Sequence, residues 1–95
     1  MATKEQVIDK LRQVKDPELD LDIWTLGLIY NIEIKGPIIN IKMTFTFPGC
    51  PYGPWLLESV RKEVSSIKGI KKVDIDLTFD PIWRPTEEVK EMLGL

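Results

Sequence analysis

A single cysteine, Cys50, lies at the break between a predicted strand and a predicted helix. The strand is expected to run from Ile39 to Phe47 and to end at Pro48-Gly49, and the helix is expected to begin after Pro51. A thiol at the start of a helix faces unpaired backbone N–H groups and the positive end of the helix dipole. Both favour the thiolate, which attacks electrophiles and binds soft metals. The position therefore indicates a reactive or metal-ligating thiol.

Two threonines precede the cysteine on the same expected strand. Thr44 and Thr46 are two residues apart, which in a strand places them on one face, with Phe45 and Phe47 on the other. We therefore expect two hydroxyl groups and the thiol at one edge of the sheet, anchored by the aromatic rings from beneath. Thr46 could donate a hydrogen bond to the thiolate sulfur, although strand propensity alone would make it an ordinary threonine facing water.

A second polar feature is an acidic loop at residues 16–22. Its four carboxylates fall within seven residues and belong to Asp16, Glu18, Asp20 and Asp22. They could set the pKa of a nearby group, bind a cation or meet a basic partner. Alternatively the loop is a solvated turn in which Asp16 caps a short helical turn opened by Pro17. Residue chemistry alone favours the solvated turn, because clusters of charges usually face water.

Three side chains that could serve function also have an ordinary structural explanation. Free cysteine is often a small buried hydrophobe, so Cys50 could be inert. Trp55 and Trp83 suit a protein core. An exposed pair of tryptophans near the cysteine would instead indicate a surface for a partner protein.

Alternation and helical spacing predict the elements that would position these residues. Alternating apolar residues predict three strands, at residues 30–35, 39–47 and 73–79. A first helix is expected to begin near Thr3, where Gln6 completes a capping box, and to end before Pro17. A second helix is expected at residues 56–67 with Gly69 as its C-cap. A third is expected to follow Thr86, with its apolar side chains inward, namely Val89, Met92 and Leu93.

The order and lengths of these elements predict one small domain over residues 1–95. The first two strands are joined by a short turn at Gly36-Pro37 and should form an antiparallel hairpin. The helix between the second and third strands forms a βαβ crossover, which sets those strands parallel. The expected fold class is therefore α/β in the two-layer α+β sense, with a mixed three-stranded sheet and the order α-β-β-α-β-α.

Composition narrows the classes of function. The 95 residues are 43% hydrophobic and 29% charged, which is typical of a globular protein, and the net charge of -2 argues against nucleic acid as a partner. No apolar run approaches the roughly 20 residues that span a bilayer, and no secretory signal is recognisable. One cysteine cannot form an internal disulfide, which indicates a reducing compartment, the cytoplasm. The absence of histidine excludes Ser-His-Asp and Cys-His catalysis and the common zinc sites.

Four motifs, in this order and spacing, resemble the MIP18 family, also called DUF59. They cover nearly the whole chain and are Asp16-Pro17-Glu18-Leu19, Leu26-Gly27-Leu28-Ile29-Tyr30, Met43-Thr44-Phe45-Thr46 with Pro48-Gly49-Cys50-Pro51, and Asp80-Pro81-Ile82-Trp83. The resemblance implies an iron–sulfur cluster assembly domain that serves the maturation of iron–sulfur proteins as a carrier or targeting factor. It carries the family's site onto Asp16, Glu18, Leu19, Thr46 and Cys50.

Two positions depart from the family pattern. Thr25 stands where most members have an aspartate, and Phe47 stands where many have a second hydroxyl directly before the proline. Both departures remove polar groups near the thiol.

The number of thiols limits how such a protein would hold a cluster. A cluster usually needs four ligands, and one chain offers one thiolate. We therefore hypothesise that any cluster is transient and is bridged between two Cys50 thiolates of a homodimer, with further ligands from outside, or is passed on from a partner. Asp16 and Glu18 would then support the site or dock a partner, because iron–sulfur sites prefer thiolate ligands.

Three classes of function remain. The first is a non-enzymatic maturation factor whose partners are iron–sulfur client or assembly proteins. The second is an adaptor that docks client proteins and has an inert Cys50. The third is a thiol redox enzyme, which would depend on an external thiol because a resolving cysteine is absent. The resemblance favours the first class, with the adaptor as the alternative.

Overall fold

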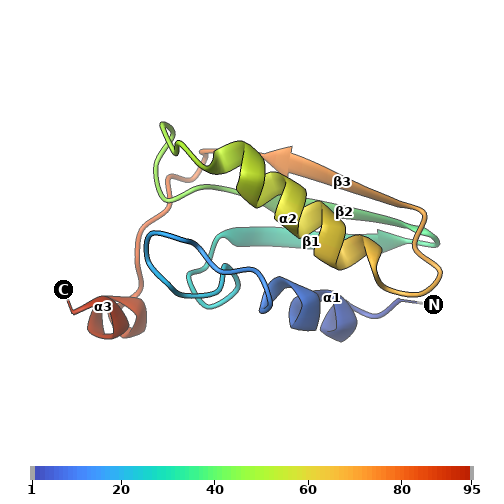
Figure 1. Ribbon diagram of the computed structural model, residues 1–95, viewed down its shortest axis with the longest axis horizontal. Coiled ribbons are helices and arrows are strands. Elements are labelled where there is room, and N and C mark those ends of the chain that lie inside the picture. Colours follow the sequence, from blue (N-terminus) through green and yellow to red (C-terminus); the bar gives the residue numbers. More distant parts are fainter. Residues whose placement is uncertain (1, 95) are drawn as a thin grey trace.

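The computed structural model describes residues 2–94 and contains three helices and three strands, in the order that the sequence predicts (Figure 1). The helices are α1, Lys4–Leu11; α2, Gly53–Ser65; and α3, Glu87–Leu93. The strands are β1, Ile29–Lys35; β2, Ile38–Met43; and β3, Lys72–Leu77. No helix within residues 2–94 is long and apolar enough to cross a bilayer.

The sheet has the order β1-β2-β3 and is mixed, as predicted. β1 and β2 are antiparallel and are joined by the tight turn at Gly36-Pro37, where Gly36 adopts a φ of +60°. β3 runs parallel to β2 because α2 carries the chain back across the sheet between them.

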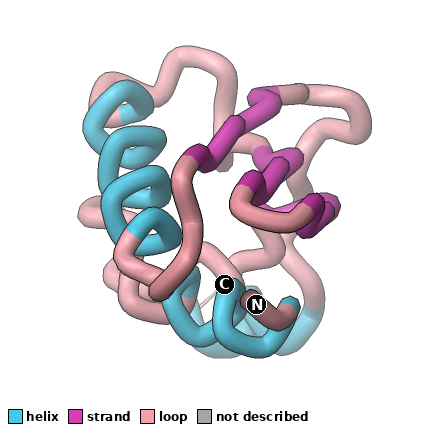
Figure 2. The backbone as a smooth tube through the Cα atoms, turned by 90° about the vertical axis from the view of Figure 1, so that its right-hand side faces the viewer, coloured by secondary structure: helices cyan, strands magenta, loops and turns pink. Residues whose placement is uncertain are grey.

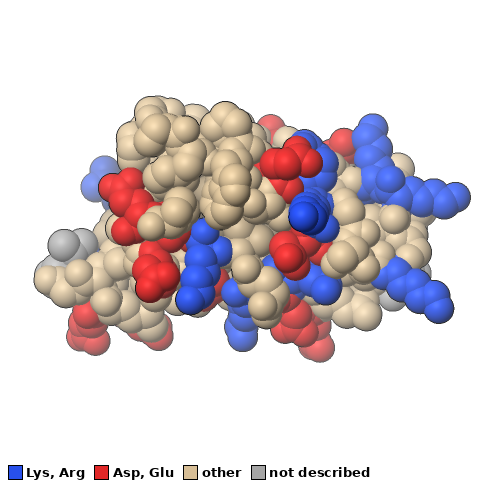
Figure 3. Space-filling view, in the orientation of Figure 1, with Lys and Arg blue, Asp and Glu red and all other residues tan. Residues whose placement is uncertain are grey.

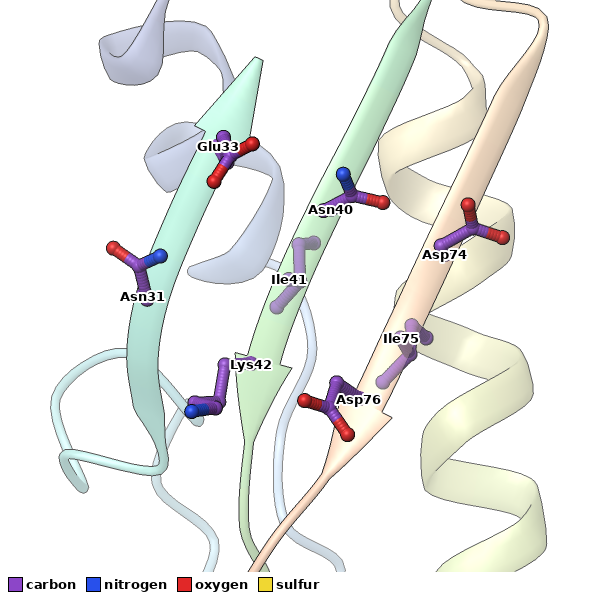
Figure 4. A pocket seen from close by; sticks show the side chains of 8 residues that line it. All are labelled: Asn31, Glu33, Asn40, Ile41, Lys42, Asp74, Ile75 and Asp76. Carbon is purple, nitrogen blue, oxygen red and sulfur yellow. The ribbon is translucent and has the colours of Figure 1, made fainter. Parts of the chain in front are cut away.

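The helices and the sheet form two layers around one core. Figure 2 shows α1 and α2 on one side of the sheet. Apolar side chains of the strands and of these two helices form one core cluster. The largest fully buried side chains of this core include Leu11, Leu28, Ile39, Ile41, Met43, Leu56, Val60 and Val64. The other face of the sheet carries the alternate, polar side chains, among them Asn31, Glu33, Asn40, Lys42, Asp74 and Asp76 (Figure 4). The two-layer fold class is therefore confirmed.

The start of α1 is confirmed in detail. The Gln6 N–H donates to the Thr3 hydroxyl at 3.2 Å, and the Thr3 N–H donates to the Gln6 side chain at 2.9 Å, which completes the capping box. The helix holds Val7 and Leu11 against the core and leads into the acidic loop.

The last two strands end earlier than the sequence predicts. β2 stops at Met43 and not at Phe47, and β3 stops at Leu77 and not at residue 79. The reason is that β2 runs out of a partner, because Met43 already pairs with Ile29, the first residue of β1. The Thr44 N–H still donates to the Leu28 carbonyl at 2.9 Å. The residue before Leu28 is Gly27, where the chain turns away with a positive φ of +79°.

Two smaller predictions about the helices are wrong. The C-cap of α2 is Ser66, and Gly69, with a φ of +91°, lies three residues later in the turn before β3. In α3, Val89 is buried but Met92 is 50% exposed. Val89 and Leu93, four residues apart, already form the inward side of this two-turn helix, which leaves Met92 facing outward.

Candidate functional site

Cys50 lies in a loop of two successive turns that links β2 to α2. Its N–H donates to the Phe47 carbonyl at 3.3 Å, and its carbonyl accepts from the Gly53 N–H at 3.2 Å. The residue is half-buried and packs against the edge of the core. α2 begins at Gly53, after Pro51 as predicted, but Pro51 and Pro54 have no N–H. The thiol therefore has fewer free backbone donors around it than a helix start ordinarily supplies.

The Cys50 loop belongs to an uncharged surface formed by residues 43–57. Fifteen consecutive residues, from Met43 to Leu57, carry no charge in a chain that is 29% charged. Phe47 is 42% exposed and Trp55 is 53% exposed. Figure 3 shows an uncharged area over the segment before α2, at the upper left, with both acidic and basic side chains around it. The thiol thus stands within an uncharged surface.

Tyr52 joins the Cys50 loop to the acidic loop, 34 to 36 residues earlier in the chain. Its hydroxyl lies 3.0 and 3.2 Å from the two carboxylate oxygens of Asp16 and 3.1 Å from Oε2 of Glu18. A neutral phenol donates one hydrogen, which is therefore shared among these acceptors. This contact brings the two predicted parts of the site together.

Asp16 caps the turn opened by Pro17, as one of the two explanations of the acidic loop predicted. Its Oδ1 accepts from the N–H groups of Glu18 at 2.9 Å and Leu19 at 3.0 Å. Asp16 itself is only 1% exposed, so this carboxylate of the expected solvated turn is buried. Burial removes the hydrogen bonds that this carboxylate would make with water, and the two N–H groups and the Tyr52 hydroxyl compensate for them.

The rest of the acidic loop has mixed exposure. Glu18 and Asp20 are exposed, and Leu19 is half-buried against the core. Within residues 2–94, no three His, Cys, Asp or Glu side chains are grouped so that they could hold a metal ion. The loop therefore contributes a buried structural carboxylate at Asp16 and exposed negative charge at Glu18 and Asp20.

The environment of Tyr52 raises the pKa of its phenol well above the usual range. Burial disfavours the phenolate, the hydrogen bond to Asp16 holds the proton, and the negative charge of Asp16 acts in the same direction. Smaller contributions come from Cys50 and from the hydrogen bond to Glu18. Tyr52 is therefore a neutral donor throughout the physiological pH range.

The raised pKa predicts how the fold responds to alkaline pH. The unfolded phenol has a pKa of about 10, so the stabilisation from protonated Tyr52 is complete below that pH and is lost as the pH rises toward the folded pKa. Phenolate formation is measured by ultraviolet absorption in the wild type and in Tyr52→Phe, and the difference between the two titrations reports Tyr52 alone. We expect this difference to show almost no ionisation of Tyr52 until circular dichroism reports unfolding. Ionisation of this phenol near pH 10 in the folded protein would contradict the contact.

The predicted row of hydroxyl groups is not present as expected. Thr44 is fully buried, and its hydroxyl donates to the Phe45 carbonyl at 3.3 Å, so the prediction that it is presented beside the thiol is wrong. Phe45 is buried as predicted, but Phe47 is exposed and does not anchor the stretch from beneath. Thr46 is half-buried. The cause is the early end of β2, because strand alternation no longer applies after Met43.

The two candidate tryptophans differ in their surroundings. Trp83 is half-buried, and its indole N–H donates to the Leu26 carbonyl at 2.6 Å, which holds the loop after β3 to the segment before β1. Tyr30 reinforces this contact, because its hydroxyl donates to the Pro81 carbonyl at 2.8 Å. Trp83 thus has the structural role, and Trp55 alone is exposed beside the Cys50 loop.

Tyr52 is the residue of the site that sequence reasoning missed. A tyrosine that follows a cysteine and a proline has no periodic signal of its own. The available hint was that a tyrosine hydroxyl beside a core usually finds a polar partner. Local patterns could not indicate that this partner is the acidic loop.

Comparison with known proteins shows which family this chain matches. Residues 4–77, from α1 to β3, match the family described as "Iron-sulfur cluster assembly protein". A "Fe-S protein maturation auxiliary factor" of Porphyromonas gingivalis is 43% identical over 98 residues, which cover 99% of this chain and 93% of the relative. An "Iron-sulfur cluster carrier protein" of Synechocystis is 32% identical over 80 residues, which cover 84% of this chain but only 23% of that longer protein.

A solved structure agrees with the sequence matches. The structure of a conserved hypothetical protein from Thermotoga maritima has a TM-score of 0.87 and 38% identity, and the match covers 99% of this chain and 96% of that chain. The matched residues 4–77 include the acidic loop, the Cys50 loop and the sheet between them. The resemblance drawn from four short motifs is thereby confirmed, and the chain belongs to the family of iron–sulfur cluster assembly proteins.

Proposed function

We propose that this protein serves the maturation of iron–sulfur proteins and that it handles an iron–sulfur cluster, as cargo, through Cys50. The observation that carries the proposal is the position of the only thiol in a chain of this family. Cys50 is half-buried in an uncharged loop, and Tyr52, two residues later, fixes that loop to the acidic loop. A thiolate at such a place is a ligand that a soft metal centre accepts and releases.

The side chains around the thiol would position it and would not be further ligands. The carboxylate of Asp16 is occupied by two backbone N–H groups and the Tyr52 hydroxyl. Because a cluster usually needs four ligands, the remaining ones would come from a donor protein, a client or a second copy of the chain. This is the role of a non-enzymatic carrier or targeting factor, and a free thiol ligand suits the reducing cytoplasm.

Anaerobic cluster reconstitution tests the role of Cys50. We expect the wild type to acquire iron, sulfide and visible charge-transfer absorption, and Cys50→Ala to lose at least about 90% of each, because the variant has no thiolate left. Ser65→Ala, which removes an exposed hydroxyl at the end of α2 opposite the Cys50 loop, serves as the control and should load like the wild type. Equal loading of Cys50→Ala would overturn the proposal.

Size exclusion of the reconstituted protein tests how the cluster is shared. A cluster bridged between two Cys50 thiolates predicts that the visible absorption elutes with a dimer. A well-occupied cluster on a strict monomer would rule out sharing between chains.

The exposure of Phe47 and Trp55 favours one alternative function, an adaptor that docks clients on the uncharged surface with an inert Cys50. The two functions differ in their dependence on sulfur. An adaptor predicts slow alkylation of Cys50 by iodoacetamide, and a purified client would bind Cys50→Ala as tightly as the wild type. A carrier predicts that transfer of the cluster to an apo-ferredoxin is lost in that variant.

A further inference from the structure

The sheet has two free edges, because β1 and β3 each pair with a strand on one side only. In β1, the two-residue turn after Lys35 directs the backbone polar groups of Lys35 and Glu33 toward β2. The groups of the alternate residues, Ile32 and Ile34, then point to the free edge. Within residues 2–94, neither of these two residues has a backbone partner outside the sheet. A further strand could therefore pair with β1.

Only the second half of β1 is open to such a strand. Trp24 and Lys4 lie beside the first half and, together with residues 29–32, line a small hollow of about 80 Å³. The segment from Ile32 to Lys35 extends beyond this hollow and ends at the hairpin turn. An added strand would thus be centred near Ile34.

We propose that two copies of this chain pair antiparallel along β1 about a two-fold axis at Ile34, which extends the sheet from three strands to six. In this register the two Ile34 residues exchange both backbone hydrogen bonds, and Glu33 of each copy stands opposite Lys35 of the other. The Glu33–Lys35 pairs occupy the positions at which side chains of antiparallel strands approach most closely.

The charges on the open face of the sheet select this register. Glu33 points out from β1 on that face (Figure 4), and Lys35 Nζ lies 2.7 Å from its carboxylate in the same chain. Pairing about Ile34 would join two such ion pairs into a group of four alternating charges. A shift that centres the axis on Glu33 would set the two glutamates opposite each other, which repels. The attractive arrangement therefore belongs to one register.

The other free edge does not offer this complementarity. The N–H groups of Lys72 and Thr78 donate toward β2, so the alternate residues of β3, among them Ile75, face the edge. Self-pairing about Ile75 would place Asp74 of one copy opposite Asp76 of the other, twice. These like charges oppose a dimer through β3 and leave β1 as the edge that favours self-association.

The proposed dimer is independent of Cys50. The turn between β1 and β2 lies at one end of the long axis and the segment before α2 at the other (Figure 1). A two-fold axis at Ile34 therefore places the two Cys50 loops at opposite ends of the assembly. A cluster bridged by two Cys50 thiolates would need a different contact, so the two ideas can be tested apart.

Sedimentation velocity of the purified chain with reductant, from about 10 μM to about 1 mM, tests the β1 dimer. The short contact predicts a weak dimer in the wild type, visible as a rise in mean mass with concentration. Glu33→Lys and Lys35→Glu should each weaken it at least about tenfold, because each sets like charges opposite one another. The double variant Glu33→Lys/Lys35→Glu should restore it.

Two controls make the outcome decisive. Lys72→Glu breaks the corresponding ion pair with Asp74 on β3, at 3.6 Å, and should leave the dimer unchanged. Cys50→Ser should leave it unchanged as well, whatever that substitution does to cluster loading. A wild type that stays monomeric throughout, single variants without effect, or a double variant that does not recover would each overturn the β1 dimer. Circular dichroism confirms that every variant is folded.

Discussion

Replacing Asp16 with alanine is expected to lower the free energy of unfolding by about 3 kcal/mol. The carboxylate is 1% exposed and accepts from the Glu18 and Leu19 N–H groups and from the Tyr52 hydroxyl. Alanine would leave the two N–H groups without their partner in a part-buried site, and the Tyr52 hydroxyl would retain only Glu18. Buried donors without partners are costly. Urea unfolding followed by circular dichroism measures the loss.

Asp22 provides the matched control for this substitution. Its Oδ2 accepts a single backbone hydrogen bond, from the Thr25 N–H at 2.9 Å, and it is only half-buried. Asp22→Ala should therefore cost about 1 kcal/mol, as ordinary loss of a cap does. If Asp16→Ala proved no more damaging than Asp22→Ala, the link between the two loops would contribute nothing to stability.

Replacing Gly53 with alanine should cost about 2 kcal/mol by overpacking. A Cβ at Gly53 would lie 2.6 and 2.9 Å from two ring atoms of Phe45, which is closer than real carbon contacts. The Phe45 ring is 6% exposed, so it has little free space into which it could move. Relief would have to shift the start of α2 away from the sheet, and with it the Cys50 loop. Thermal and urea unfolding measure the cost.

Gly49 lies in the same loop and serves as the control. A Cβ there would meet the Phe47 ring at 3.5 Å, an ordinary contact with an exposed side chain. Gly49→Ala should therefore be neutral or slightly stabilising, because alanine restricts the unfolded chain more than glycine does. The double variant Gly53→Ala/Phe45→Leu should recover part of the loss, since the smaller side chain leaves room for the methyl group. Equal effects of the two glycine substitutions would show that the contact with Phe45 is not the cause.

Periodicity predicted most of the fold because it reports which face of an element is buried. The observed core contains the apolar residues that alternate from Ile39 to Met43. It also contains the residues at helical spacing, namely Leu56, Val60 and Val64. The same reasoning extended β2 too far. Alternation persists through Phe47, but a strand also requires a neighbour to pair with, and beyond Met43 no residue of β1 is left, because Met43 already pairs with its first residue, Ile29.

The site was predictable only in its components. Cys50 and Asp16 were recognisable from residue type and from the motifs around them. That Asp16 is buried, and that Tyr52 connects it to the Cys50 loop, depends on how residues 34 to 36 positions apart pack together. Local sequence patterns carry no information about such a contact. A hydrogen bond between distant side chains is a property of the folded chain alone.

The end-to-end separation of the Cys50 loop and the β1–β2 turn bears on how the protein can be labelled. The molecule is 40 Å long, and Figure 1 shows the first described residues at the end with the β1–β2 turn, whereas α3 and the last described residues lie at the end with the Cys50 loop. A fluorescent or affinity domain fused after residue 94 would therefore stand near the Cys50 loop, through which we propose that the cargo is handled. The same domain fused before residue 2 would leave that loop open and would crowd the free edge of β1.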